Sequence, residues 1–414
     1  MNILLLSCGV PYPPDSGPRV KTYQLIRHLA SRHRVSLVCL DPDGTGAARA
    51  PALQDLCADL RVVQLPARRG EWLARLFGGQ PALLARYRSD ELHRLLAQMV
   101  AEAAAAKRPF DLVHVDQIVM APYAERLALP RVLDAHNAVW KIYADAAEQQ
   151  GWPGSWLARQ EAARLRAYEG RICAEFEAVL TVSEEDRAAL AEASGGAGAL
   201  SVVPLGVDSS ALPSVRRAAG AQDVLSLATP GWPPNADGIA WFAREVFPLV
   251  RRAAPASRFF ICGPQPTPEL QDLPERASGI EVTGFVNPLP YLERAAVLIA
   301  PLRSSGGMRV MLLEALARGV PVVATTLACA GLELTAGEHL LIADSPSEFA
   351  DAVALLLRDP ELGARIATAG RQRVIERYDW RALYPAIDLV YARITAQGAP
   401  QSQEGPTGQP VAIS

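Results

Sequence analysis

The sequence predicts an α/β protein built from two Rossmann-like, doubly wound domains. Short runs of uniformly apolar residues, typical of buried parallel strands, alternate along the chain with segments of helical periodicity. The alternation is interrupted at residues 209–222, where Ser, Pro, Arg and Ala accumulate, and then starts again. A chain of 414 residues is also too long for one ordinary core, so we expect two domains of roughly 200 residues each.

The interruption sets the predicted domain boundaries. We assign residues 1–208 to the first domain, residues 209–222 to a linker and residues 223–378 to the second domain. The helical pattern at residues 379–395 is expected to return to the first domain. Residues 396–414 are rich in Gly, Gln and Pro, a composition that favours disorder.

The first domain opens with a strand, a glycine-containing loop, a helix and a second strand, an order typical of nucleotide-binding folds. Gly17, in the loop of residues 8–18, could offer its N–H to a ligand, although the loop lacks G-x-G-x-x-G spacing and could equally be a plain turn. The predicted strands are residues 3–7, 35–40, 61–65, 111–115, 131–134, 179–182 and 200–203. The predicted helices begin near residue 19 and cover residues 90–106 and 155–177.

Two polar residues follow predicted strands of this domain. His136 comes just after residues 131–134, at the edge where open α/β sheets place functional groups, so it could face a substrate or act as a structural hydrogen-bond partner. Ser183 has an acidic residue three positions later, which predicts a helix N-cap without a catalytic role.

The composition excludes several classes of protein. A net charge of −3 and the lack of a long basic tract argue against a nucleic-acid partner. Six scattered cysteines without a C-x-x-C pair predict a reducing compartment and neither disulfides nor a zinc site. No apolar run reaches about 18 residues and no cationic leader precedes the first strand, so we expect a cytoplasmic protein.

Residues 66–89 interleave five arginines with Trp, Leu and Phe. This interleaving suggests peripheral contact with the anionic inner face of a membrane. An amphipathic helix packed on its own domain is the alternative, because the segment is short and interrupted at Gly78 and Gly79.

The second domain contains the stretch around which we expect the functional site to be organised, residues 297–325. An apolar strand at residues 297–300 leads into a loop with two adjacent glycines, Gly306 and Gly307, and then into a helix that ends at Gly319. The other predicted strands are residues 224–228, 258–262, 280–282, 320–323 and 340–342. A loop is predicted at residues 229–238, and helices from about residues 239, 346, 360 and 380.

The loop that contains Gly306 and Gly307 could bind a phosphate. A helix N-terminus favours an anion, and adjacent glycines allow a phosphate to approach the backbone closely. Arg309 adds a positive fork for phosphate oxygens, and Glu314 could accept hydrogen bonds from a ribose or sugar hydroxyl pair. A strand-to-helix turn without a ligand is the alternative.

Six motifs carry a resemblance that covers most of the chain. They are PYPPDSG (11–17), VSEED (182–186), VPLGVD (203–208), PPN (233–235), GFV (284–286) and the stretch 301–325. In this order and spacing the sequence resembles the retaining GT-B glycosyltransferases of the family-4 type, in particular bacterial exopolysaccharide-associated members.

The resemblance implies two domains that face each other across a cleft. A nucleotide-diphosphate sugar, UDP- or GDP-linked, would be held mainly by the second domain, and a glycan or lipid-linked acceptor mainly by the first. By position, Arg309, Glu314 and His136 would be the catalytic residues, with Glu314 on the nucleotide ribose. The donor-binding residues would be Gly17, Asn235, Gly284, Phe285, Val286, Ser304, Ser305, Gly306, Gly307, Met308, Arg309 and Glu314.

The sequence departs from the family pattern at three places. Gly306 stands where a glutamate is common, Met311 stands where a lysine is common, and the loop at residues 229–238 has no basic residue. Arg309, with Arg303 as a second candidate, is then the nearest cation for the leaving group.

The resemblance implies a hexosyltransferase-type enzyme that transfers a sugar with retention in surface or exopolysaccharide synthesis. Neither a metal ion nor a cofactor would be needed, because arginine and helix dipoles would neutralise the departing diphosphate. Two alternatives remain open. One is a nucleotide-sugar 2-epimerase of the same fold, which would need more carboxylates in the cleft; the other is a degenerate, non-catalytic GT-B binding module.

Overall fold

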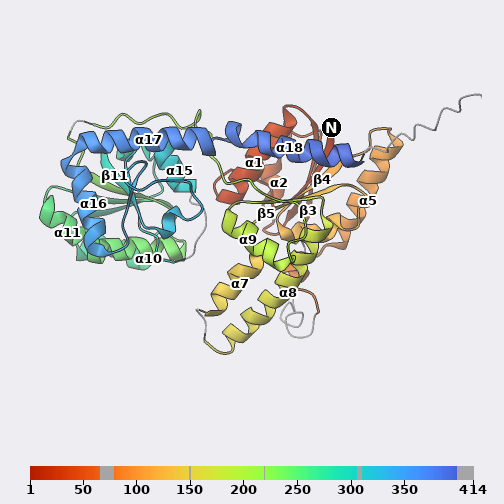
Figure 1. Cartoon of the computed structure of the whole chain (residues 1–414), viewed down its shortest axis with the longest axis horizontal. Coiled ribbons are helices and arrows are strands. Elements are labelled where there is room, and N and C mark those ends of the chain that lie inside the picture. Colours follow the sequence, from red (N-terminus) through yellow and green to blue (C-terminus); the bar gives the residue numbers. More distant parts are fainter. Residues whose placement is uncertain (66–78, 149–150, 219, 305–309, 399–414) are drawn as a thin grey trace, which may run out of the picture.

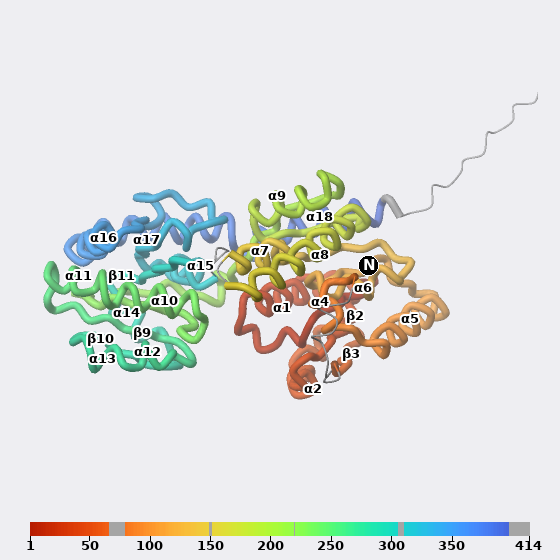
Figure 2. The backbone as a smooth tube through the Cα atoms, turned by 90° about the horizontal axis from the view of Figure 1, so that it is seen from below, coloured from red at the N-terminus to blue at the C-terminus, as the bar shows by residue number. Residues whose placement is uncertain are grey.

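The computed structural model describes residues 1–65, 79–148, 151–218, 220–304 and 310–398. Two parallel sheets lie in separate halves of the molecule, each covered by helices on both faces (Figures 1 and 2). Uniformly apolar strands produce this architecture, since a parallel sheet covered on both faces buries both sides of each strand. None of the described helices combines the length and the apolar character needed to cross a membrane.

The first sheet has seven parallel strands in the order β3-β2-β1-β4-β5-β6-β7. The strands are β1 (Asn2–Cys8), β2 (Arg34–Asp41), β3 (Asp59–Gln64), β4 (Leu112–Asp116), β5 (Arg131–His136), β6 (Ala178–Thr181) and β7 (Leu200–Val202). The helices are α1 (Gly17–Ala30), α2 (Gly46–Arg49), α4 (Ala82–Arg86), α5 (Asp90–Ala105), α6 (Ala121–Ala124), α7 (Val139–Glu148), α8 (Gly154–Glu175) and α9 (Glu184–Ala193). The order reverses beside β1, so the carboxyl ends of β1 and β4 flank the switch point where open sheets bind ligands.

The second sheet has six parallel strands in the order β10-β9-β8-β11-β12-β13. The strands are β8 (Asp223–Leu227), β9 (Phe259–Cys262), β10 (Ile280–Gly284), β11 (Ala295–Ala300), β12 (Val322–Ala324) and β13 (Leu341–Ile342). The helices are α10 (Pro233–Trp241), α11 (Phe247–Ala253), α12 (Pro268–Gln271), α13 (Leu273–Arg276), α14 (Leu289–Arg294), α15 (Val310–Ala317), α16 (Pro346–Arg358) and α17 (Pro360–Tyr378). Its switch point lies between β8 and β11, directly before the stretch that the sequence marks as central.

The last helix, α18 (Trp380–Gly398), leaves the second domain and packs along the first (Figure 1). Its buried residues Ile387, Val390 and Ile394 belong to the same apolar cluster as β1 and β2. Asp388 accepts hydrogen bonds at 2.7 Å from His28 and from Arg32, both at the end of α1 and its following turn.

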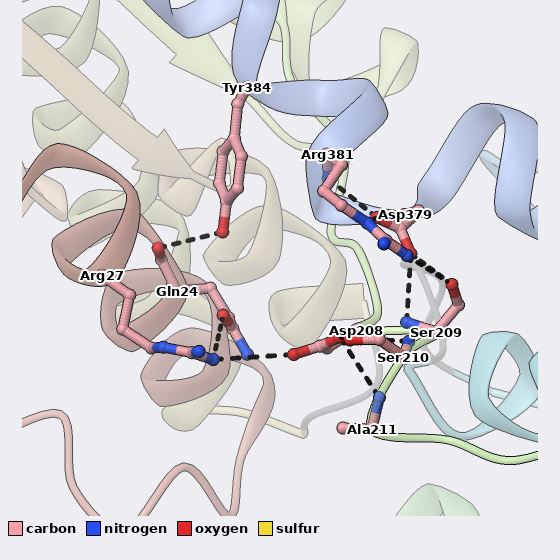
Figure 3. Close-up of polar contacts among 9 residues, drawn as sticks. All are labelled: Gln24, Arg27, Asp208, Ser209, Ser210, Ala211, Asp379, Arg381 and Tyr384. Carbon is pink, nitrogen blue, oxygen red and sulfur yellow. Dashed lines mark hydrogen bonds and ion pairs between the residues drawn. The ribbon is translucent and has the colours of Figure 1, made fainter. Parts of the chain in front are cut away.

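The chain passes between the two domains twice, and the two crossing segments are joined to each other (Figure 3). Val207 donates its N–H to the carbonyl of Tyr378 at 2.8 Å, and Trp380 donates back to Val207 at 3.1 Å. The buried carboxylate of Asp379 accepts from Ser209 and from the Arg381 backbone and guanidinium. Both crossings therefore form a single hydrogen-bonded joint.

The secondary structure differs from the sequence-based expectation at several places. Helix α7 was not predicted, β5 continues to His136, and residues 396–398, expected in the disordered tail, belong to α18. Helix α10 begins at Pro233, inside the predicted loop, because prolines at the first helical positions lose no hydrogen bond there. Ser183 caps α9 as predicted, by accepting from the Asp186 N–H at 3.1 Å.

Candidate active site

The carboxyl edge of the second sheet gathers the predicted donor-binding residues of the second domain that the structure describes. Because all six strands are parallel, the loops after β8, β10 and β11 open at the same edge. Ser304 lies in the loop after β11, and Glu314 lies on α15 just beyond it. The predicted residues Ser305, Gly306, Gly307, Met308 and Arg309 lie outside the described residues.

Glu314 occupies the second turn of α15 and is partly buried. Burial raises the pKa of its carboxyl above the usual value, and the charge of Arg318, one turn further along, opposes this effect. A partly buried carboxylate near a helix N-terminus can accept hydrogen bonds from a hydroxyl pair.

Helix α10 packs directly against the start of the loop after β11. A Cβ on Gly238 would lie 2.1 Å from the carbonyl oxygen of Pro301, so only glycine permits this approach. Asn235, predicted to lie in a loop, is in the first turn of α10, where its side chain donates to the carbonyl of Thr229 at 3.2 Å. Together with Met311, Asn235 and Pro301 line a small cavity at this edge.

The segment Gly284–Val286 lies at the end of the outer strand β10. Gly284 has φ of 71°, a backbone conformation that favours glycine, and its carbonyl accepts from the N–H of Gly263 at 2.9 Å. Phe285 is 86% exposed, whereas Val286 packs partly into the core. The segment thus presents backbone and one aromatic ring to solvent at the predicted donor edge.

Gly17 is where the first domain meets this site. It is the first residue of α1, and a Cβ there would lie 3.6 Å from Leu205 and 3.7 Å from Val310, the first residue of α15. The amino ends of α1 and α15 therefore approach each other from the two domains. The amino end of a helix carries a partial positive charge, so an anion between these two helix ends would be stabilised.

His136 is buried at the end of β5, with 4% of the residue exposed. Its Nε2 lies 2.7 Å from a carboxylate oxygen of Asp116. Asp134 lies 3.9 Å from the same ring nitrogen and pairs with Lys21. Neither Asp116 nor Lys21 was predicted as functional from the sequence. The sequence signal was that Asp116 follows the predicted strand of residues 111–115 and Asp134 ends the predicted strand of residues 131–134, while Lys21 follows Gly17 by one helical turn.

The membrane-contact prediction for residues 66–89 falls partly outside the described residues. Its described part contains α4, where Leu84 is buried in the core of the first domain. Burial of Leu84 is what an amphipathic helix packed on its own domain would show.

Comparisons with known proteins agree with this architecture. The model of the family described as "Glycosyl transferase 4-like domain" matches residues 16–206, and that of "Glycosyl transferases group 1" matches residues 222–359. A phosphatidyl-myo-inositol mannosyltransferase of Mycobacterium leprae is 36% identical over 26% of this chain and 29% of its own length. A glycogen synthase of Mycobacterium tuberculosis is 24% identical over 94% of both chains.

Solved structures share the fold over nearly the whole chain. A sucrose-phosphate synthase from Thermosynechococcus elongatus superposes with a TM-score of 0.67 at 18% identity, over 96% of this chain and 100% of that one. Anabaena HepE in complex with UDP-glucose superposes with a TM-score of 0.61 at 16% identity, over 96% and 100%. With both family models matched in succession, the chain belongs to the GT-B glycosyltransferases of the family-4 type and is a hexosyltransferase-type enzyme.

Proposed function

We propose that this enzyme transfers a hexose with retention from a nucleoside-diphosphate sugar to a glycan or lipid-linked saccharide. The approach of Gly17 to Val310 carries this proposal, because it brings two helix amino ends together between the domains. A diphosphate bound there would meet backbone N–H groups from both sides. Binding would require neither a metal ion nor a cofactor.

The chemistry follows from the charge that develops on the leaving group. As the bond from sugar to phosphate breaks, negative charge grows on the diphosphate, and the amino end of α15 together with Arg309 would neutralise it. Glu314 would hold the ribose hydroxyls and so fix the donor in register with α15. The acceptor hydroxyl would attack from the face that the diphosphate leaves, and the departing phosphate would take its proton.

The known relatives support a nucleotide-sugar donor and a saccharide acceptor. The HepE structure contains UDP-glucose, and the mycobacterial relatives are a mannosyltransferase that acts on a phosphatidyl-inositol and a glycogen synthase. We propose a UDP- or GDP-linked donor and a role in surface or exopolysaccharide synthesis at the inner face of the membrane.

A thermal-shift panel tests the donor assignment. UDP, GDP, ADP and their glucose and mannose conjugates would be titrated into the wild type, Arg309→Ala and Arg276→Ala. Arg276 is the matched control, an exposed arginine of the same domain that pairs with Asp272. A ligand that binds only the folded state stabilises it and so raises the melting temperature. At a ligand concentration of one hundred times Kd, the free energy of unfolding increases by about 2.7 kcal/mol.

We expect one nucleotide series to stabilise the wild type and the control, and to stabilise Arg309→Ala less. No shift for any nucleotide at millimolar concentration would overturn the proposed donor assignment. The anomeric coupling constant of the product, measured by proton NMR, tests retention: a product of inverted configuration contradicts same-face attack.

A further inference from the structure

A buried row of polar side chains crosses the carboxyl edge of the first sheet. The strand register places Ser7 beside Asp116, and Asp116 beside Asp134. Lys21 of α1 and His136 of β5 complete the cluster, and each of the five residues is at most 4% exposed. Charges at this depth destabilise a fold unless they are paired and hydrogen-bonded, so the geometry of each partner matters.

Asp116 is the centre of this cluster. One carboxylate oxygen lies 2.7 Å from His136 Nε2, and the other accepts from Ser7 at 2.7 Å and from Thr22 at 3.0 Å. Because Thr22 belongs to α1, Asp116 connects the imidazole of His136 to the helix whose first residue is Gly17.

Lys21 and Asp134 make a second link between α1 and the sheet. The ammonium of Lys21 lies 2.6 Å from the Asp134 carboxylate, and both side chains are 2% exposed. Burial alone would raise the pKa of Asp134, but the charge of Lys21 and its hydrogen bond lower it below its usual value. Asp134 is therefore ionised at neutral pH, and α1 is held at two points within its second turn.

The backbone has a positive φ at His136 and at Gln117, the residue after Asp116. His136 has φ of 60°, and the N–H of Asn137 donates to the carbonyl of Ala135 at 2.7 Å, so His136 is the middle residue of a γ-turn. Gln117, directly after Asp116, has φ of 73° and ψ of 150°. Such conformations cost about 1–3 kcal/mol each in non-glycine residues and persist only where the surrounding contacts impose them.

We propose that Asp116 is a positioning residue for sugar transfer. A carboxylate can only accept, so Asp116 keeps a proton on His136 Nε2 and leaves Nδ1 as the ring atom presented to substrate. None of the described residues makes a hydrogen bond to Nδ1. The same carboxylate, through Thr22, fixes His136 relative to the amino end of α1. This inference rests on the proposed function, since it assigns the substrate side of His136.

The first test needs no substrate and uses a variant only to assign the His136 signal. In protein labelled with ¹⁵N-histidine, long-range ¹H–¹⁵N spectra report which ring nitrogen of each histidine is protonated. His136, assigned by the signal lost in His136→Ala, is expected to carry a proton on Nε2 at pH 7.5. A bare Nε2 with a protonated Nδ1 overturns the inference, whatever the activity of the protein.

The second test separates positioning from a general structural role. Release of UDP from UDP-glucose, or of GDP from GDP-mannose, would be measured for Asp116→Asn, His136→Ala and the double variant. An amide can rotate to donate to Nε2 and so favour the opposite tautomer. We expect Asp116→Asn to lower kcat by roughly tenfold to hundredfold with little change in KM.

The double variant is decisive, because a residue that acts through His136 has no further effect once His136 is absent. We expect less than about a threefold additional loss for Asp116→Asn in the His136→Ala background. A loss as large as in the wild-type background overturns the inference, since it would reflect damage to α1 or the sheet. If wild type releases no nucleotide, the proposed function fails, and the ring-state measurement alone then decides the inference.

Discussion

His114, buried beneath the last helix, is predicted to make the stability of the first domain depend on pH. It lies on β4 with no exposed surface, and the hydroxyl of Tyr391, from α18, lies 2.7 Å from its Nδ1. None of the described residues makes a hydrogen bond to its Nε2. Burial lowers the pKa of His114 from 6.5 to about 4, although the charges of Asp134 and Asp116 oppose this. His114 is therefore neutral in the folded protein at neutral pH.

The low pKa makes stability depend on pH in a defined direction. Between pH 6.5 and about 4 the unfolded state binds a proton at His114 that the folded state does not, so acidification favours unfolding. Above pH 6.5 the group is neutral in both states and the dependence disappears. At about 1.4 kcal/mol for each pKa unit, the difference between the two pKa values corresponds to roughly 3 kcal/mol.

His114→Asn removes the titrating ring and tests this value. Urea unfolding followed by circular dichroism would be measured for wild type and variant from pH 7.5 to 4. We expect the stability advantage of the wild type to shrink by roughly 3 kcal/mol across this range. Tyr391→Phe is the control, because it keeps the ring and should keep the pH dependence while losing about 1 kcal/mol throughout. Parallel curves for wild type and His114→Asn would refute the reasoning.

Three further predictions concern the second domain and the joint. Glu314→Gln should leave the melting temperature unchanged or raise it, because burial disfavours the charge, yet weaken UDP binding about tenfold to hundredfold in calorimetry. Gly238→Ala should cost roughly 1–3 kcal/mol in urea unfolding, since its Cβ would overlap the Pro301 carbonyl; an unchanged midpoint contradicts this. Asp379→Asn should destabilise by roughly 2–4 kcal/mol, because it weakens the bonds from Ser209 and Arg381; a loss below about 0.5 kcal/mol contradicts this.

Local sequence patterns were sufficient for much of the fold. Apolar runs located the strands of both sheets, and glycines marked ends such as Gly319, whose φ of 72° favours glycine. Where the pattern was ambiguous, the prediction failed. Trp232 followed by two prolines was interpreted as a loop, whereas the prolines begin α10. The first N–H groups of α7, those of Val139 and Trp140, donate to the carboxylate of Glu169, about 30 positions away, which no local pattern shows.

The buried cluster of the first domain could not be derived in the same way. Lys21 and Asp134 are 113 positions apart, and no local pattern shows that α1 places this lysine over the end of β5. His136 was identified by its position after a strand, but its burial depends on Asp116 and α1 together. The approach of Gly17 to Val310 likewise depends on how two separately recognisable domains meet.

The placement of α18 has a consequence for synthesis on the ribosome. Strand β7 ends at Val202, yet the apolar surface beside β1 and β2 is covered by residues that begin only at Trp380. The first domain therefore leaves the exit tunnel with part of its core open, and it stays so while the second domain is made. Chaperones would meet this surface in every nascent chain until α18 is made, and a stop codon that falls before α18 would damage the first domain although all of its own strands had been translated.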